Sequence, residues 1–192
     1  MSFVIRPATR RDALHLAALI DIAGHGIEVP FWIDQSEEDH APLATARRLA
    51  MEEEGLPYHY SKAHLLESDG EIAAGVFGEL VPDAPQIHPE EADYLIPLLE
   101  LESALPGYWA VIGIAVFPEF RGRGMGRQLL DHALSQAKLK GAKGLSIVVE
   151  DTNAQAIGLY RRWGFADRET RRWLPYGERT GPNTWVLLTR QF

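Results

Sequence analysis

The stretch from Arg121 to Gly126, RGRGMG, has the composition of an anion-binding turn. It follows the apolar run 108–117 and precedes a segment with apolar residues at helical spacing. Glycines allow main-chain N–H groups to point at a ligand without obstruction by a Cβ atom, and the free N–H groups of a first helical turn favour an anion. Arg121 and Arg123 can add charge-assisted hydrogen bonds. These residues predict a site for a diphosphate group.

The spacing of this turn excludes two common nucleotide-binding motifs. A P-loop needs Lys followed by Ser or Thr after its last glycine, where this chain has Arg127 and Gln128. A dinucleotide-binding turn of the Rossmann type needs glycine at the position of Arg127, and its strand opens the domain. An ordinary glycine-capped turn between a strand and a helix stays open as the alternative.

Residues 114–126 resemble the acetyl-CoA-binding motif of the GNAT superfamily of acyl-CoA N-acyltransferases. That motif, Gln/Arg-x-x-Gly-x-Gly/Ala directly after the central strand, is met by Arg121, Gly124 and Gly126. The motifs cover residues 108–165, and the order of elements resembles the family over nearly the whole chain. The stretch 82–107 is longer than a minimal member needs.

A second hallmark of this family lies in residues 153–165. It consists of Asn153, Ala156, Leu159, Tyr160 and the pair Gly164-Phe165. The resemblance implies acetyl-CoA as co-substrate and no metal. The cofactor-binding residues that it implies are Ile114, Ala115, Val116, Arg121, Gly122, Arg123, Gly124, Met125, Gly126, Asn153 and Tyr160.

Acyl transfer from a thioester to an amine needs a proton donor for the leaving thiolate and a proton acceptor for the ammonium. Asn153 and Tyr160 are seven residues apart and therefore share one helix face, so Tyr160 is the expected general acid; a packed core tyrosine is the alternative. Glu102 is the expected general base because it lies shortly before the strand 108–117, and a solvated loop acid is the alternative. The other candidates for the base are Glu79, Glu100 and His88.

Charge is distributed unevenly over a chain whose formal net charge is −8. Residues 63–120 contain no Lys or Arg, whereas residues 121–192 hold 13 of the 19. This partition suggests a cationic ligand near the middle of the chain and an anionic one near its end. Nucleic acid is disfavoured as a partner because the chain is acidic and lacks an aromatic-interleaved basic motif. Four aromatic residues, which form either acceptor walls or core packing, are Phe31, Trp32, Tyr58 and Tyr60.

The chain has 192 residues and no cysteine, which excludes disulfides, thiolate zinc sites, iron–sulfur clusters and cysteine nucleophiles. The histidines show no metal-binding spacing. No run approaches the roughly 18 apolar residues of a membrane span. We therefore expect a cytoplasmic protein with no membrane partner, and a homodimer is left open.

Periodicity predicts an α/β fold with strands and helices in alternation. The Asp69-Gly70 pair predicts a hairpin, Thr9 and Asp12 have the spacing of a capping box, and Gly113 indicates a bulge or a close ligand approach. We expect a loop at 27–35. The expected strands cover 3–6, 64–68, 71–80, 108–117, 145–149, 165–173 and 184–189. The expected helices lie within 13–22, 42–54, 94–101, between the glycine turn and Gly141, and at 154–163.

The resemblance refines this to a GNAT-like mixed, mostly antiparallel central sheet flanked by helices and splayed between the fourth and fifth strands. Residues 1–192 are then a single N-acetyltransferase domain with 82–107 as a surface insertion. The implied activity, in the EC 2.3.1 class, is transfer of an acetyl group to the primary amine of a small-molecule or peptide acceptor by direct attack in a ternary complex. The alternatives are an acyl-CoA-binding sensor without turnover and an interaction domain whose 82–107 segment docks a basic partner.

Overall fold

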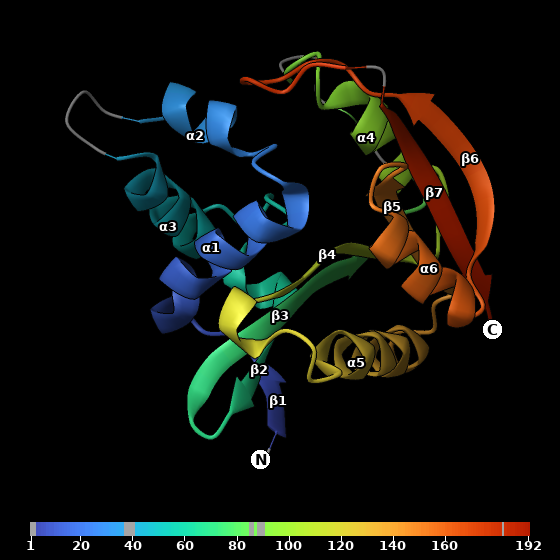
Figure 1. Cartoon of the computed structure of the whole chain (residues 1–192), viewed down its shortest axis with the longest axis horizontal. Helices are drawn as coiled ribbons and strands as arrows, with labels where there is room; N and C mark the ends of the chain where they lie inside the picture. The colour runs from blue at the N-terminus through green and yellow to red at the C-terminus, as the bar shows by residue number, and fades with distance from the viewer. Residues whose placement is uncertain (1–2, 37–40, 85–86, 88–90, 182) are drawn as a thin grey trace. The chain divides into compact units, whose positions relative to one another are not determined.

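The strand order confirms the predicted fold class. In a computed structural model of the chain, seven strands form a sheet in the order β1-β2-β3-β4-β5-β7-β6, with helices against it (Figure 1). Every pair with a described register is antiparallel except β4–β5, whose parallel register runs from Trp109–Leu145 to Val111–Ile147. The strands are β1 (Phe3–Pro7), β2 (Ala63–Ser68), β3 (Glu71–Leu80), β4 (Trp109–Val116), β5 (Gly144–Glu150), β6 (Ala166–Arg172) and β7 (Thr184–Gln191).

The structure describes residues 3–36, 41–84, 87, 91–181 and 183–192. They divide into two compact units: unit 1 is Met1–Gly78 with Gly113–Ala133, and unit 2 is Glu79–Ile112 with Leu134–Phe192. The single-domain organisation and the splay further along β4 and β5 stay predictions, because β4 from Gly113 onward belongs to unit 1. The helices are α1 (Ala13–Gly24), α2 (Val29–Asp34), α3 (Pro42–Glu52), α4 (Ile96–Glu102), α5 (Met125–Leu139) and α6 (Ala154–Arg162).

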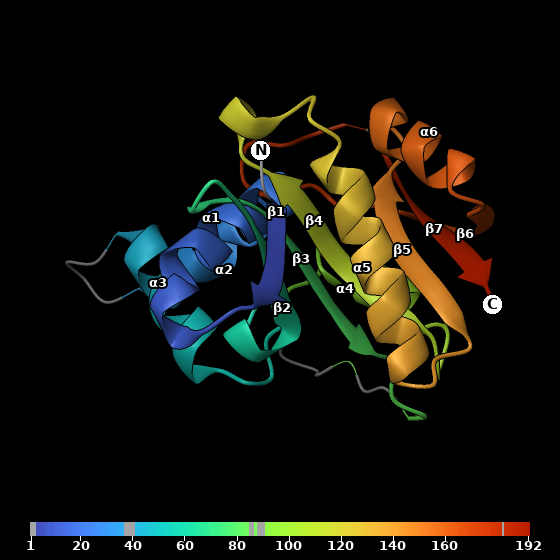
Figure 2. The ribbon, with the colours of Figure 1, turned by 90° about the horizontal axis from the view of Figure 1, so that it is seen from below.

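The β2–β3 hairpin of unit 1 forms where the sequence predicted it. Asp69 and Gly70 both have positive φ, 52° and 89°, as a two-residue hairpin turn of type I′ requires. Strand β1 pairs with β2 from Phe3–Ser68 to Pro7–His64, and Figure 2 shows the two strands side by side.

The helices of unit 1 correct one prediction, because residues 29–34 of the expected loop form helix α2. Pro30 stands in the first turn of this helix, where the missing N–H costs no hydrogen bond and the fixed φ suits the helix. Trp32 is buried from α2, and its indole Nε1 donates to the Tyr58 hydroxyl at 2.9 Å. Helices α1 and α2 both contact α3.

Gly113 is required by the close approach of a helix. A Cβ atom at this position would lie 3.0 Å from Ala23 Cβ and 3.3 Å from Ile20 Cδ1, both on α1. The sequence predicted a bulge or a ligand here, and within unit 1 the approaching group is α1 itself.

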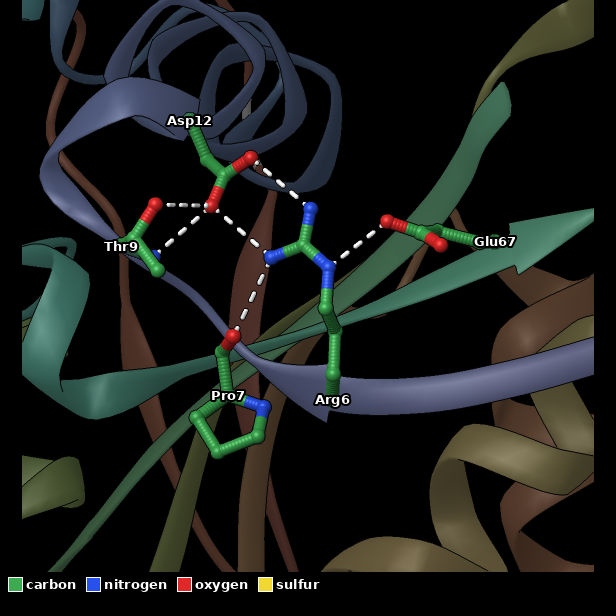
Figure 3. A network of polar contacts seen from close by, with 5 residues as sticks. All are labelled: Arg6, Pro7, Thr9, Asp12 and Glu67. Atoms are coloured by element: carbon green, nitrogen blue, oxygen red, sulfur yellow. Dashed lines mark hydrogen bonds and ion pairs between the residues drawn. The ribbon is translucent and has the colours of Figure 1, made fainter. Parts of the chain in front are cut away.

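A polar network joins β1, β2 and the start of α1 (Figure 3). Asp12 accepts hydrogen bonds from the Arg6 guanidinium at both oxygens, each at 2.9 Å, and from the backbone and hydroxyl of Thr9. Arg6 Nε also donates to Glu67 at 2.6 Å. The capping box predicted from Thr9 and Asp12 is therefore confirmed. The hydrogen bond from the Arg6 guanidinium lowers the pKa of the Asp12 carboxyl and has a larger effect than burial, which raises it. The pKa is therefore lowered to about 2.

We expect Asp12→Asn to lower the free energy of unfolding by about 2 kcal/mol at pH 7. A carboxyl whose pKa is lowered on folding stabilises the fold at pH values above its unfolded pKa near 4. The difference in free energy of unfolding between the unaltered chain and the variant therefore shrinks as the pH falls from 4 to 2. Urea unfolding at pH 7 and pH 3 measures it. The control is Asp131→Asn, which loses an exposed pair with Arg127 and costs less than about 1 kcal/mol. Equal losses at both pH values would contradict the assignment.

Unit 2 is organised around β5 and β7. Residues Trp185–Leu188 of β7 are all buried, so both faces of this strand are covered. Helix α4 contacts β5, β6 and β7 and contributes the fully buried Leu101. It confirms the helix predicted within 94–101, whereas the description of 82–107 as a surface insertion stays a prediction.

Among the described residues, no helix is both long and apolar enough to cross a membrane.

Candidate functional site

The glycine turn predicted as a diphosphate site connects β4 to α5 in unit 1 and is exposed except at Met125 and Gly126. Gly122 and Gly124 have φ values of 78° and 77°, a backbone conformation that other L residues rarely adopt. A Cβ atom built at Gly122, Gly124 or Gly126 meets nothing within 4 Å. Gly122 and Gly124 therefore meet a backbone requirement, and all three glycines leave open space over the turn.

The amides of this turn are available for a ligand. Within the described part of unit 1, Arg121 N–H donates to Pro118 O, and the N–H groups of Arg127 and Gln128 donate to Gly124 O. No backbone acceptor is described in this unit for the amides of residues 122–126. Successive free amides in a turn with left-handed residues form an anion-binding concavity, and the dipole of α5 adds to it. The turn fits a diphosphate.

The two arginines of the turn rest on the loop beside it. Arg123 Nη2 donates to Glu119 O at 3.0 Å, and its guanidinium lies 5.3 Å from the centroid of the Phe120 ring. Arg121 Nε donates to Val116 O at 3.2 Å. Both side chains are exposed, so their remaining N–H groups can bind an anion.

The strand residues of the predicted site precede the turn in the same unit. Ala115 is buried, whereas Ile114 and Val116 are half-buried, which is the alternation expected of a strand with one covered face. The carbonyl of Val116 accepts from Arg121 Nε, so the Arg121 side chain folds back onto the end of β4.

A protein-family model described as the acetyltransferase (GNAT) family matches residues 27–165. The chain belongs to the GNAT family. Its match to the [ribosomal protein bS18]-alanine N-acetyltransferase of Salmonella typhimurium is 40% identical over 62 residues, which is 32% of this chain and 42% of that protein. The matched part thus spans less than half of that relative.

Solved structures agree with the GNAT fold. One acetyltransferase crystal structure is 23% identical, with a TM-score of 0.69 and coverage of 98% of both chains. Another, from Bacillus anthracis and solved in complex with acetyl coenzyme A, is 15% identical, with a TM-score of 0.50 over 68% of this chain and 61% of that one. At these identities the likeness shows the fold alone.

The second GNAT hallmark lies in unit 2, on α6. Asn153 is the N-cap of this helix, and its Oδ1 accepts from Ala156 N–H at 3.1 Å. Capping satisfies one of the free amides of the first turn and leaves the side-chain NH2 of Asn153 as a donor. The residue therefore has a structural role besides the cofactor contact that the resemblance implies.

Tyr160 is buried on the same helix, 8% exposed, with its ring 5.9 Å from that of Phe165. Among the residues that the structure describes, no hydrogen bond contributes to the pKa shift of its hydroxyl. Burial raises the pKa of Tyr160 to about 12, so the phenol keeps its proton at neutral pH. A neutral phenol can donate to an incoming group, although burial alone also suits a core tyrosine.

The general base is less defined than the acid. Glu102 is half-buried at the end of α4 in unit 2 and stays a prediction. Glu100 forms an exposed ion pair with Arg171 at 3.1 Å, which occupies its carboxylate, and Glu79 is half-buried at the end of β3. His88 lies outside the described residues.

The aromatic residues considered for the acceptor site are in part core residues. Trp32 and Tyr58 are 2% and 0% exposed and are hydrogen-bonded to each other, so they pack the core of unit 1. Phe31 and Tyr60 are half-buried.

One cluster of unit 2 was missed from the sequence. The carboxylate of Glu150, at the end of β5, is joined to Arg179 of the β6–β7 connection by bonds of 2.6 and 2.8 Å. The regular spacing of Trp173, Tyr176 and Arg179 is a weak indication of such a cluster. No local pattern links these residues to Glu150, which lies 29 positions before Arg179.

Proposed function

We propose that the chain is an acetyl-CoA-dependent N-acetyltransferase of the EC 2.3.1 class. The observation that carries this proposal is the glycine turn, in which left-handed Gly122 and Gly124 leave the amides of residues 122–126 open at the start of α5. Membership of the GNAT family and the acetyl coenzyme A bound to a protein of similar fold support the co-substrate. The acceptor is a primary amine of a small or cationic molecule or of a peptide.

The proposed reaction is direct attack in a ternary complex. The bound co-substrate supplies an activated thioester. The acceptor ammonium loses a proton to a base, for which Glu102 is the candidate, and the free amine then forms the new C–N bond while the C–S bond breaks. The departing thiolate accepts a hydrogen bond and then the proton from Tyr160, and the tyrosinate recovers a proton from the attacking nitrogen, which loses its second proton as the amide forms. A phenol with a raised pKa is suited to donating a hydrogen bond, because it stays neutral while negative charge develops on sulfur.

Each unit holds residues that the family resemblance predicts to bind the cofactor. In unit 1, the amides of residues 122–126 with Arg121 and Arg123 would hold the diphosphate, and main-chain groups of Ile114, Ala115 and Val116 would hold the pantetheine arm. In unit 2, Asn153 and Tyr160 would meet the arm and the sulfur. The name of the Salmonella typhimurium relative, which refers to an alanine amine of a ribosomal protein, is compatible with a peptide acceptor.

Calorimetric titration with acetyl-CoA tests the cofactor site. We expect Arg123→Glu to weaken binding by about tenfold or more, because it replaces a charge-assisted donor with a repelling carboxylate; tenfold is about 1.4 kcal/mol. The control is Arg48→Glu, the same charge change at an exposed arginine that is ion-paired within α3, and it should alter affinity less than twofold. Absence of binding to the unaltered chain would overturn the proposal.

A thiol-release screen over amines tests turnover. Release of coenzyme A that depends on an added amine supports the enzyme. Binding of acetyl-CoA without turnover on any amine, α-amino peptides and polyamines included, would favour the acyl-CoA-binding sensor instead.

A further inference from the structure

Two histidines that are distant in the sequence meet in unit 1. His64 lies on β2 and His132 on α5, and their ring centroids are 4.5 Å apart with the ring planes tilted by 58°. Both side chains are half-buried, so solvent reaches the pair. We call His64 and His132 the histidine pair. Their separation along the chain gives no metal-binding spacing, and only the fold brings the two imidazoles together.

The neighbours of His64 in the sheet are apolar. His64 pairs with Pro7 of β1 and Val76 of β3, whose side chains cannot form hydrogen bonds. No hydrogen bond contributes to the pKa shift of His64. On the other side of the pair, His132 Nε2 is buried and has no hydrogen-bond partner among the described residues. A buried ring nitrogen without a partner is costly, and a ligand that binds to nitrogen would offset that cost.

Both imidazoles are predominantly neutral at pH 7. Burial, followed by the proximity of His132, lowers the pKa of His64 to about 4, and burial also lowers the pKa of His132. A neutral imidazole has one ring nitrogen with a free lone pair, and this is the form that binds a metal ion. The histidine pair therefore offers two nitrogen ligands without first having to lose protons.

The distance between the rings indicates which coordination geometry fits. With metal–nitrogen bonds of about 2.0–2.1 Å, two imidazoles on one ion have ring centroids roughly 4.5 Å apart at a right angle and roughly 5.2 Å apart at a tetrahedral angle. The observed 4.5 Å fits the right angle, which Cu²⁺ and Ni²⁺ favour, whereas Zn²⁺ favours the tetrahedron. Among the described residues, no third His, Cys, Asp or Glu completes a metal-binding group, so water would fill the other positions.

We propose that the histidine pair is a binding site for a divalent transition-metal ion of square-planar or octahedral preference, held by one ring nitrogen of His64 and one of His132. The ion would join β2 to α5, the helix that follows the glycine turn, and would satisfy the buried Nε2 of His132. The proposal does not depend on the acetyltransferase function, because it uses neither the amides of the turn nor Tyr160.

Calorimetric titration with Ni²⁺, without acetyl-CoA, tests the site. We expect Ni²⁺ to bind the unaltered chain and to bind His64→Phe and His132→Phe at least about tenfold more weakly, since even an altered partner of a ligand commonly costs that much. Phenylalanine keeps a ring at each position and removes the nitrogens. Mg²⁺, which takes oxygen ligands, should not compete with Ni²⁺.

The matched control is His25→Asn. His25 is exposed and has a φ of 51°, a backbone conformation that Asn adopts more readily than most residues. Its loss should change the Ni²⁺ affinity less than about twofold, because it removes an imidazole outside the pair. A loss as large as that of His64→Phe would show adventitious binding to surface histidines and would overturn the proposal.

Electron paramagnetic resonance of Cu²⁺ is a second measurement, which uses the unaltered chain and needs no variant to fold. The spectrum with an equimolar amount of Cu²⁺ should show coupling to two imidazole nitrogens. Coupling to fewer nitrogens would overturn the proposal. Absence of Ni²⁺ binding, or a Ni²⁺ affinity that is the same in the unaltered chain and in both phenylalanine variants, would overturn it as well.

Discussion

Gly124→Val is expected to weaken acetyl-CoA binding on the order of 100-fold, which corresponds to about 2.7 kcal/mol. Gly124 has a φ of 77°, and a β-branched residue forces the backbone away from this value. The amides of the turn then no longer converge on one anion. Losing one or two charge-assisted backbone bonds, at about 1.5–3 kcal/mol each, accounts for the loss. Calorimetric titration measures it.

The control for Gly124→Val is Gly141→Val. Gly141 follows α5 with a φ of 68°, and a Cβ atom there also meets nothing within 4 Å. Both variants should lose a similar stability, roughly 1–2 kcal/mol, but Gly141→Val should keep its affinity for acetyl-CoA. If both variants lose affinity equally, general destabilisation explains the effect and the turn is an ordinary helix cap.

Tyr160→Phe is expected to lower kcat by about 100-fold or more, as loss of a general acid does, while the acetyl-CoA affinity stays within a few fold. The substitution removes one hydroxyl and keeps the ring contact with Phe165. Steady-state kinetics with the amine found in the screen, together with calorimetry, separate the two effects. Unchanged kcat would make Tyr160 a core residue.

The pH profile provides a second test of Tyr160. Its raised pKa of about 12 means that the phenol is protonated below that value, so kcat should not fall between pH 8 and 10 through its ionisation. Tyr108→Phe is the matched control: the Tyr108 hydroxyl accepts an exposed hydrogen bond from Gln191, and its loss should leave kcat within about twofold. A basic limb in this range that disappears in Tyr160→Phe would contradict the assignment.

The tertiary structure decided several features that local sequence patterns left open. The run 27–35 reads as a loop because Pro30 and mixed polarity hide its periodicity, yet its residues 29–34 form a helix whose Trp32 packs against Tyr58. Gly113 suggested a bulge or a ligand, but the group that approaches it is α1, whose Ala23 lies 90 positions earlier in the chain. The Glu150–Arg179 ion pair could not be predicted either, because neither residue by itself indicates that the other is its partner.

The sequence by itself determined the elements whose causes are local. The Asp69-Gly70 turn, the capping box at Thr9 and the αL glycines of the turn before α5 follow from backbone preferences of a few adjacent residues. Motif spacing likewise pointed to the GNAT family. Side chains distant in sequence meet only through packing, which no local preference encodes, so the Glu150–Arg179 pair and the partners of Arg6, Trp32 and Gly113 became visible only in the folded chain.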